Sequence, residues 1–322
     1  MKKITITGGS GFIGTNLIKF LLEQGHTIQN IDTSHPVIER HKPYWQSVDI
    51  LDVKSLTESI TAFSPNIIIH LAAVTDLDGT TPEYYSANTD GTQNIIDVAN
   101  TLPHLERVVF TSSMYVCKPG YIPNDYEDYK PHTLYGESKV EGEKLVKAIQ
   151  RARYGWTIIR PTSIWGPWFK IPYIDFFKVV YQGKYFDFGK ACTKTYGFVE
   201  NAVFQINGLL IADAAQGQTF YIGDKPPIQI SEWANEISIV MKKGPIKSVP
   251  YPLLKVAALG GDVLLKLKVK FPITSFRLGN MTTNNILPVD NLYEIVGKPP
   301  VSRAEGVKKT IDWLVKERDY VI

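Results

Sequence analysis

The chain is predicted to fold as an α/β protein, with a doubly wound parallel sheet and a smaller C-terminal lobe. Three observations support this fold class. Apolar β-prone runs alternate with helical runs as far as Pro161, a glycine-rich turn joins the first strand to the first helix, and aromatics, prolines and loops increase after Pro161. Such alternation is typical of parallel sheets, because each crossover between neighbouring parallel strands needs a long connection, usually a helix.

The alternation gives the elements in order. Each expected strand is a short apolar run, and each expected helix has apolar residues at helical spacing. Gly25 is placed to end the first helix, and Pro65 lies just beyond the second. We expect strands at 2–7, 27–31, 66–70, 107–111 and 156–160, and helices at 17–22, 55–62, 88–100 and 135–150.

The point where the alternation weakens suggests a division of the chain. We expect a dinucleotide-binding domain over residues 1–165, with returning segments near 195–215. Residues 166–322 are expected to form mainly a substrate-binding lobe.

The glycine-rich turn indicates a Rossmann-type dinucleotide site. Gly8 permits the tight turn, and Gly11 lets a pyrophosphate approach the backbone where Phe12 and Ile13 begin the helix. Gly14 lets the helix pack closely on the strand. The free N–H groups and the dipole of the helix N-terminus favour an anion there.

Asp32 is expected to contact the cofactor at the end of the second strand, with Thr33 beside it. A carboxylate there accepts hydrogen bonds from the adenosine ribose and repels a 2′-phosphate, so NAD is favoured over NADP. The alternative is a solvated aspartate in a turn.

Tyr135 and Lys139 are expected to share one face of a helix, since they are four residues apart. A tyrosine has an ordinary pKa of about 10, and a nearby ammonium stabilises its phenolate as an acid–base group. Ser112 and Ser113 end a strand, where open α/β sheets place ligand groups. The ordinary alternatives are a core aromatic, a surface lysine and a turn cap.

Together these residues resemble the extended short-chain dehydrogenase/reductase superfamily, in its NAD-dependent epimerase/dehydratase family, over nearly the whole chain. The resemblance implies that Ser113, Tyr135 and Lys139 are catalytic. It further implies a set of cofactor-contacting and structural positions: Asp49 and Ile50 at the adenine, Leu71, Ala72 and Ala73 after His70, the motif residue Asn88, Ser112, and the hinge residue Pro161.

Two positions narrow the subclass. Met114 and Tyr115 follow Ser113, where sugar 4,6-dehydratases of this family carry an Asp–Glu pair that eliminates water. The absence of that pair argues against dehydration and leaves epimerisation or ketone reduction.

The resemblance also implies substrate contacts. Lys194 lies where related nucleotide-sugar enzymes place an arginine on the diphosphate, and Arg277 belongs to a stretch similar to a second such motif. Two convergent cations suit a pyrophosphate, although both side chains could instead face solvent. Thr75 and Ser163 are the other expected substrate contacts.

Composition excludes several function classes. The 35 basic and 32 acidic residues give a net charge of +3, which does not favour a nucleic-acid partner. Six scattered histidines predict no metal site. Cys117 and Cys192 show no paired spacing, which favours free thiols in a reducing compartment. Met1-Lys2-Lys3 is not followed by the apolar run of a signal peptide. We therefore expect a cytoplasmic protein.

The segment 252–269 comes closest to a membrane span. Gly260, Gly261, Asp262 and several lysines interrupt it, and it is short of the roughly 18 uninterrupted apolar residues that a span needs. We expect a packed helix pair there and no integral membrane segment, with peripheral membrane contact as the alternative.

Three functions are weighed. The first is a nucleotide-diphosphate-sugar epimerase acting at carbon 4, of the kind that serves polysaccharide biosynthesis. The second is a ketoreductase or dehydrogenase of a nucleotide sugar or a 3β-hydroxysteroid-like alcohol, with the apolar set Trp165, Trp168, Phe169, Phe176 and Phe177 as a pocket or as core. The third is a non-catalytic dinucleotide sensor, which the intact Ser113, Tyr135 and Lys139 argue against.

A homodimer is expected as well. The family resemblance implies pairing through the helices at 88–100 and 135–150, which carry apolar residues on more than one face. These are Ile95, Ile96, Val98, Val140, Leu145, Val146 and Ile149.

Overall fold

The computed structural model describes the chain from Met1 to Ile322 except residues 151, 172, 188 and 267–274. The side chains of Lys266, Phe276, Arg277, Asn280 and Met281 also lie outside the described part. All statements below concern the described residues.

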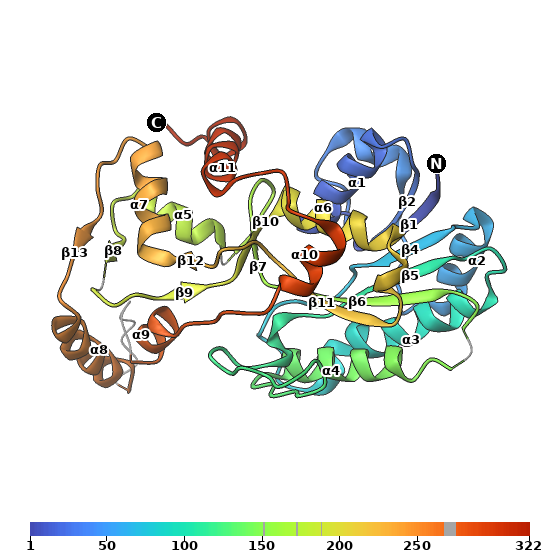
Figure 1. Ribbon diagram of the computed structural model, residues 1–322, viewed down its shortest axis with the longest axis horizontal. Helices are drawn as coiled ribbons and strands as arrows, with labels where there is room; N and C mark the ends of the chain where they lie inside the picture. Colours follow the sequence, from blue (N-terminus) through green and yellow to red (C-terminus); the bar gives the residue numbers. More distant parts are fainter. Residues whose placement is uncertain (151, 172, 188, 267–274) are drawn as a thin grey trace.

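A seven-stranded sheet forms the centre of the larger part of the molecule (Figure 1), in the order β11-β6-β5-β4-β1-β2-β3. Every pairing in it is parallel, so the predicted doubly wound sheet is confirmed. Its order reverses between β1 and β4, which opens a crevice at their carboxyl ends. The strands are β1 (Lys3–Thr7), β2 (Thr27–Ile31), β3 (Trp45–Gln46), β4 (Ile67–His70), β5 (Arg107–Thr111), β6 (Gly155–Pro161) and β11 (Gln218–Ile222).

Helices cover both faces of this sheet. One buried apolar cluster joins the sheet to α1 (Phe12–Glu23), α6 (Val199–Ile211) and α10 (Asp290–Val296). A second joins the opposite face to α2 (Val53–Phe63), α3 (Ser86–Thr101) and α4 (Leu134–Lys147). Short 3-10 turns lie between these elements: η1 (Glu39–Tyr44), η2 (Pro82–Tyr85), η3 (Met114–Val116) and η4 (Asp213–Ala215).

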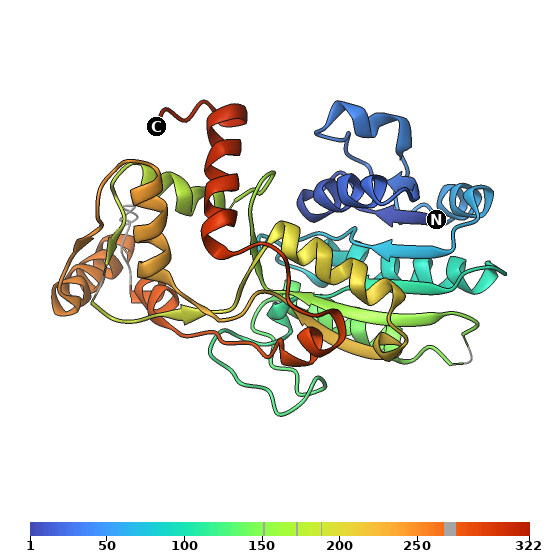
Figure 2. The same ribbon diagram turned by 45° about the horizontal axis from the view of Figure 1, so that its top comes forward.

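The rest of the chain forms a smaller lobe beside the carboxyl ends of the strands (Figures 1 and 2). It is built on three two-stranded pairs, β7 (Ser163–Trp165) with β10 (Tyr196–Phe198), β9 (Thr193–Lys194) with β12 (Ile228–Gln229), and β8 (Phe186–Asp187) with β13 (Lys247–Ser248). Its helices are α5 (Tyr173–Tyr181), α7 (Ile230–Val240), α8 (Tyr251–Lys266), α9 (Ser275–Thr282) and α11 (Arg303–Arg318).

The chain crosses between the two parts more than once. The segment expected to return near 195–215 contains α6, which packs on the sheet, and β11 then adds an edge strand that sequence patterns did not place. We propose on this basis that residues 1–165, with α6 and β11, form the cofactor domain, and that most of 166–322 forms the substrate lobe.

The large aromatics of the lobe form its core. Trp165, Phe169 and Phe177 are fully buried, and Phe176 stacks on Trp233 at 4.9 Å. These rings therefore pack against one another, and of the two alternatives for this set, core packing describes the structure better than an open greasy pocket.

The described part of the segment 252–269 forms one helix, α8, and the second helix of the pair, α9, lies beyond the segment at Ser275–Thr282. Leu254 and Ala258 of α8 pack against Leu278 of α9 in a small buried cluster; residues 267–269 lie outside the described residues. Within the described ranges, no helix combines the length and the apolar character that crossing a bilayer requires.

Candidate active site

The glycine-rich turn has the geometry that its sequence predicts. Gly8 has a φ of +73°, and a Cβ on it would lie 2.6 Å from the backbone nitrogen of Ala72. A Cβ on Gly14 would lie 2.5 Å from the carbonyl oxygen of Gly8. Gly11 caps α1 without any side-chain hydrogen bond, so the N–H groups that start the helix at Phe12 and Ile13 remain available to an anion.

Asp32 lies at the end of β2 and connects this strand to the glycine-rich turn. Its carboxylate accepts hydrogen bonds from the N–H groups of Ser10, at 2.9 Å, and Ser34, at 2.8 Å. A carboxylate has about four acceptor positions, so two N–H bonds leave capacity for ribose hydroxyls. Thr33, beside it, is exposed.

Asn88 fixes the loop that follows β4. Its side-chain oxygen accepts from the N–H of Val74, and its amide donates to the Val74 carbonyl and to the Ser138 hydroxyl, each at 2.9 Å. The Ser138 hydroxyl donates in turn to the carbonyl of Tyr135 at 2.8 Å. Asn88 thereby holds the loop containing Leu71, Ala72, Ala73 and the exposed Thr75 beside α4.

The two residues predicted to contact the adenine differ in burial. Ile50 is buried under α3, where the Asn94 amide donates to its carbonyl at 2.9 Å. Asp49 is exposed, and its carboxylate accepts from the N–H of Leu51 at 2.9 Å. Pro161 ends β6 opposite Ile222 of β11, where the chain enters the lobe.

Ser113, Tyr135 and Lys139 come together at the carboxyl end of β5. The Ser113 hydroxyl accepts from the N–H of Tyr115 at 3.1 Å and caps η3. Burial raises the pKa of the Tyr135 phenol to about 12, and its hydrogen bond with Ser113 opposes that rise. Serine and phenol are thus in direct contact, the arrangement that joint acid–base work on one oxygen requires.

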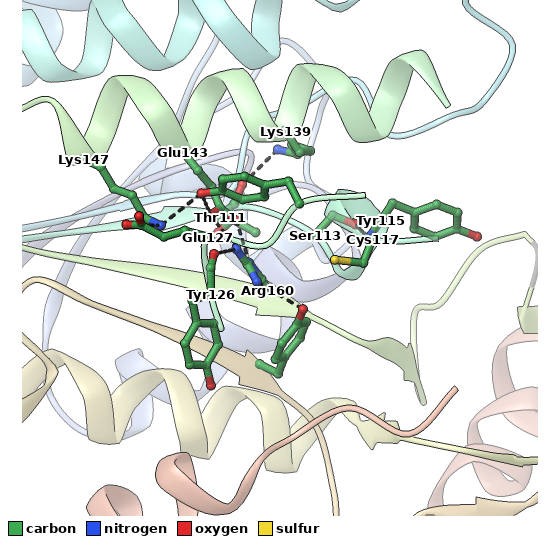
Figure 3. Close-up of polar contacts among 12 residues, drawn as sticks. Thr111, Ser113, Tyr115, Cys117, Tyr126, Glu127, Lys139, Glu143, Lys147 and Arg160 are labelled. Atoms are coloured by element: carbon green, nitrogen blue, oxygen red, sulfur yellow. Dashed lines mark hydrogen bonds and ion pairs between the residues drawn. The ribbon is translucent and has the colours of Figure 1, made fainter. Parts of the chain in front are cut away.

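Lys139 is buried one helical turn after Tyr135. Its ammonium donates to the carbonyl of Thr111 at 2.9 Å (Figure 3). Burial lowers the pKa of Lys139 to about 8, and the carboxylate of Glu143 raises it. The hydroxyls of Thr111 and Ser112 are buried without a hydrogen-bond partner beside this ammonium, which leaves polar groups for a ligand to satisfy.

Glu143 is a residue that sequence reasoning missed. It forms a bidentate ion pair with Arg160 of β6, at 2.7 and 2.8 Å, and both side chains are 1% exposed. Tyr129 donates to the same carboxylate at 2.9 Å, and Arg160 also donates to the Tyr126 carbonyl at 2.6 Å (Figure 3). Glu143 therefore anchors α4 to the sheet and to the loop at 121–130.

Several tyrosines gather around Tyr135, and these too were missed. The rings of Tyr115 and Tyr85 lie 5.9 and 6.1 Å from its ring. Tyr173 of the lobe reaches the same place: burial raises its pKa, a hydrogen bond with Ser163 opposes the rise, and the Tyr115 and Tyr135 phenols raise it further. The predicted substrate residue Ser163 is therefore brought to the site.

Lys194 enters from the lobe side. It lies in β9, bridged to Asn285, whose amide lies 3.9 Å from the sulfur of Met114 next to Ser113. Lys194 is half-buried, and this burial lowers its pKa. Arg277 lies in α9, and its side chain is outside the described residues. The structure thus brings one of the two predicted cations toward the site.

The described residues include no group of three His, Cys, Asp or Glu side chains that could hold a metal ion. Cys117 and Cys192 are free and buried. His70 is buried at the end of β4 beside the Thr7 hydroxyl, at 2.7 Å, and burial lowers its pKa to about 3. It is therefore a neutral structural residue.

These features fit a bound NAD. The uncapped start of α1 suits the pyrophosphate, Asp32 suits the adenosine ribose, and Lys139, with the unpartnered Thr111 and Ser112 hydroxyls beside it, offers polar groups at the far end of the crevice.

The chain is similar to known proteins. The pattern of the NAD dependent epimerase/dehydratase family matches residues 4–175. A 3-beta-hydroxysteroid dehydrogenase of Mycolicibacterium neoaurum is 28% identical, over 94% of this chain and 88% of its own. A UDP-glucose 4-epimerase of Vibrio cholerae is also 28% identical, over 96% of this chain and 94% of its own.

Solved structures share the fold. The UDP-glucose 4-epimerase of Thermotoga maritima with UDP-glucose superposes with a TM-score of 0.74 at 20% identity, covering 98% of this chain and 99% of that one. The UDP-glucose 4-epimerase of Thermus thermophilus with NAD gives a TM-score of 0.74 at 18% identity, with the same coverage.

Proposed function

The chain belongs to the NAD-dependent epimerase/dehydratase family, and within it we propose that the protein is a nucleotide-sugar epimerase, acting at carbon 4. It is an enzyme of the oxidoreductase or isomerase kind, and NAD is its cofactor. The observation that carries the proposal is the buried contact of Ser113 with Tyr135, one helical turn from Lys139 and without an acidic pair at Met114 and Tyr115.

The chemistry that NAD supplies when bound is the reversible acceptance of a hydride. Tyr135 takes the proton of the sugar hydroxyl during oxidation and returns it after the keto sugar has turned in the site. Ser113 donates a hydrogen bond to the same oxygen. Lys139 holds a positive charge on the face of α4 that carries Tyr135, which favours the phenolate. Because the hydride returns to the sugar, the reaction consumes no cofactor.

The lining of the site supports a polar substrate. Tyr85, Tyr115 and Tyr173 around Tyr135 combine aromatic faces with hydroxyl groups, and the C–H faces and hydroxyls of a sugar ring match both. A half-buried cation such as Lys194 suits a diphosphate oxygen. We propose Lys194 and Arg277 as its ligands, with Thr75 and Ser163 at the sugar.

A second candidate is a dehydrogenase or ketoreductase of a nucleotide sugar or a 3β-hydroxysteroid-like alcohol. The relationship to the mycobacterial-type 3-beta-hydroxysteroid dehydrogenase favours it. A steroid needs a large apolar cavity, and the aromatic set that could have lined one is buried as core, with Trp165, Phe169 and Phe177 fully enclosed. We therefore rank it second.

A nucleotide-sugar panel tests the proposal. The purified protein with a catalytic amount of NAD is mixed with each sugar, and both isomer composition and absorbance of NADH are followed. Isomer conversion without net NADH is the expected result. Steady NADH formation with an uncharged alcohol, and no isomer conversion, would favour the second candidate.

Assembly and compartment are also proposed. We propose a homodimer paired through α3 and α4. Five of the apolar side chains expected in the interface are buried within the single chain, and of the expected set only Leu145 and Ile149 are partly exposed; the buried ones are Ile95, Ile96, Val98, Val140 and Val146. A monomer in light scattering at micromolar concentration would refute it.

We propose that the protein works in the cytoplasm, because its two buried free thiols suit a reducing compartment. The pathway class that we propose is polysaccharide biosynthesis.

A further inference from the structure

Helix α8 lies at the end of the lobe farthest from the sheet (Figures 1 and 2), and one of its faces is apolar and exposed. Its inner face packs on α9 through Leu254 and Ala258. At 100° per residue, a separate set of apolar side chains falls on the opposite side of the helix. These are Leu253, Val256, Leu259 and Val263, which are 62%, 69%, 62% and 58% exposed.

Positive side chains lie beside the start of this helix, and the sequence around it is rich in them. From Lys242 to Thr282 the sequence holds seven lysines and one arginine against a single acid, Asp262, although the whole chain is nearly balanced at +3. Lys190 and Lys255 are exposed, and their ammonium groups lie 5.4 and 5.2 Å from the ring centre of Tyr251 at the start of α8. Asp262 accepts a hydrogen bond from the N–H of Ser275, so it is used inside the helix pair.

We infer that this face of α8 docks on an anionic lipid bilayer. The helix would lie in the plane of the interface, with the four apolar side chains of its outer face among the upper acyl chains and with Lys190 and Lys255 on headgroup phosphates. A stretch of 16 residues is about 24 Å long, shorter than the roughly 30 Å hydrocarbon core of a bilayer, and its inner face is held against α9. The helix therefore rests on the bilayer and does not cross it.

A second copy of the chain fits this face less well. In a two-fold interface the same patch meets itself, so the lysines around one stripe would face those around the other. Anionic lipid satisfies the apolar stripe and the charge at once. The inference does not depend on which substrate the site binds.

Vesicle sedimentation of the full chain tests this inference. We expect the protein to sediment with phosphatidylglycerol-containing vesicles, to bind pure phosphatidylcholine weakly, and to be released by salt. The double variant Val256→Asp/Val263→Asp should lose about tenfold or more in vesicle affinity, because it places two charges in the apolar stripe. NAD affinity equal to that of the wild type shows that the variant is folded.

The matched control is Ile122→Asp/Ile211→Asp, which changes two side chains that are 82% and 77% exposed elsewhere. It should bind vesicles like the wild type. Absence of wild-type binding to anionic vesicles, or equal loss in both double variants, would overturn the inference. A wild-type dimer that Val256→Asp/Val263→Asp dissociates, without any vesicle binding, would assign the face to a second copy.

Discussion

At the scale of single residues, the account depends on the phenolic oxygen of Tyr135. Tyr135→Phe should lower turnover by about 10²–10⁴-fold, since it removes a positioned acid–base group while its ring keeps its contacts. NAD affinity should stay close to that of the wild type. Steady-state rates and a cofactor titration check both statements, and near-normal turnover would contradict the mechanism.

Glu143 should set the pH above which the reaction rate falls, because its carboxylate raises the pKa of Lys139. Loss of the Lys139 proton should lower the rate as the pH rises through about 8, the pKa that burial gives it. Glu143→Gln removes the charge that raises this pKa, so the alkaline limb of the pH–rate profile should move to lower pH. The unpaired Arg160 should also cost about 3–5 kcal/mol of stability.

Tyr129→Phe provides the control for Glu143. It deletes the 2.9 Å hydrogen bond to the same carboxylate and leaves every charge in place. Its cost should be about 1 kcal/mol, and its alkaline limb should match the wild type. A purely structural role for Glu143 would be indicated if Glu143→Gln lost stability but kept the wild-type limb.

Sequence reasoning placed Tyr135 and Lys139 together but missed their neighbours, for a physical reason. Tyr135 and Lys139 share a helix face, and that spacing is readable from the chain. Glu143 continues the same i+4 series and could have been found in this way. Tyr85 and Tyr173 could not, because their approach to Tyr135 depends on how the lobe packs against the sheet.

At the scale of elements, the junction of β1 and α1 should tolerate no side chain at Gly14. Gly14→Ala places a Cβ 2.5 Å from the Gly8 carbonyl oxygen, where backbone must shift. We expect a loss of about 1–3 kcal/mol in stability and a large loss of NAD affinity. Thermal unfolding and cofactor titration measure the two effects.

Gly260→Ala is the matched control for that change. Gly260 lies inside α8, and nothing lies within 4 Å of the position of its Cβ. Gly260→Ala should stabilise the helix by about 0.5–1 kcal/mol and leave NAD affinity unchanged. Equal effects of the two substitutions would refute the close-packing role of Gly14.

The longer elements were predictable because their patterns repeat. The apolar run at 66–70 became β4, and the expected helix at 88–100 lies inside α3. The strands of the lobe, such as β9 and β12, have only two residues each, too few to show any period. Pairings between strands that are distant in the sequence, such as β11 with β6, could not be predicted from local patterns, because they depend on how the whole chain packs.

At the scale of the whole molecule, the lobe beside the carboxyl ends of the strands should select for a diphosphate. Lys194→Ala and Arg277→Ala should each weaken nucleotide-sugar binding, because a cation in a partly desolvated site holds phosphate oxygens strongly. The double variant should be worse than either, with NAD affinity spared. Unchanged nucleotide-sugar affinity in Arg277→Ala would favour the dehydrogenase.

The fate of the carbon-bound hydrogen tests the central claim most directly. A nucleotide sugar carrying deuterium at carbon 4 is incubated with the enzyme and a trace of NAD, and the product is analysed by mass spectrometry and NMR. Hydride return predicts an epimer at carbon 4 that keeps its deuterium, with no accumulation of NADH. Loss of the deuterium to solvent, or a keto product formed together with stoichiometric NADH, would contradict the account.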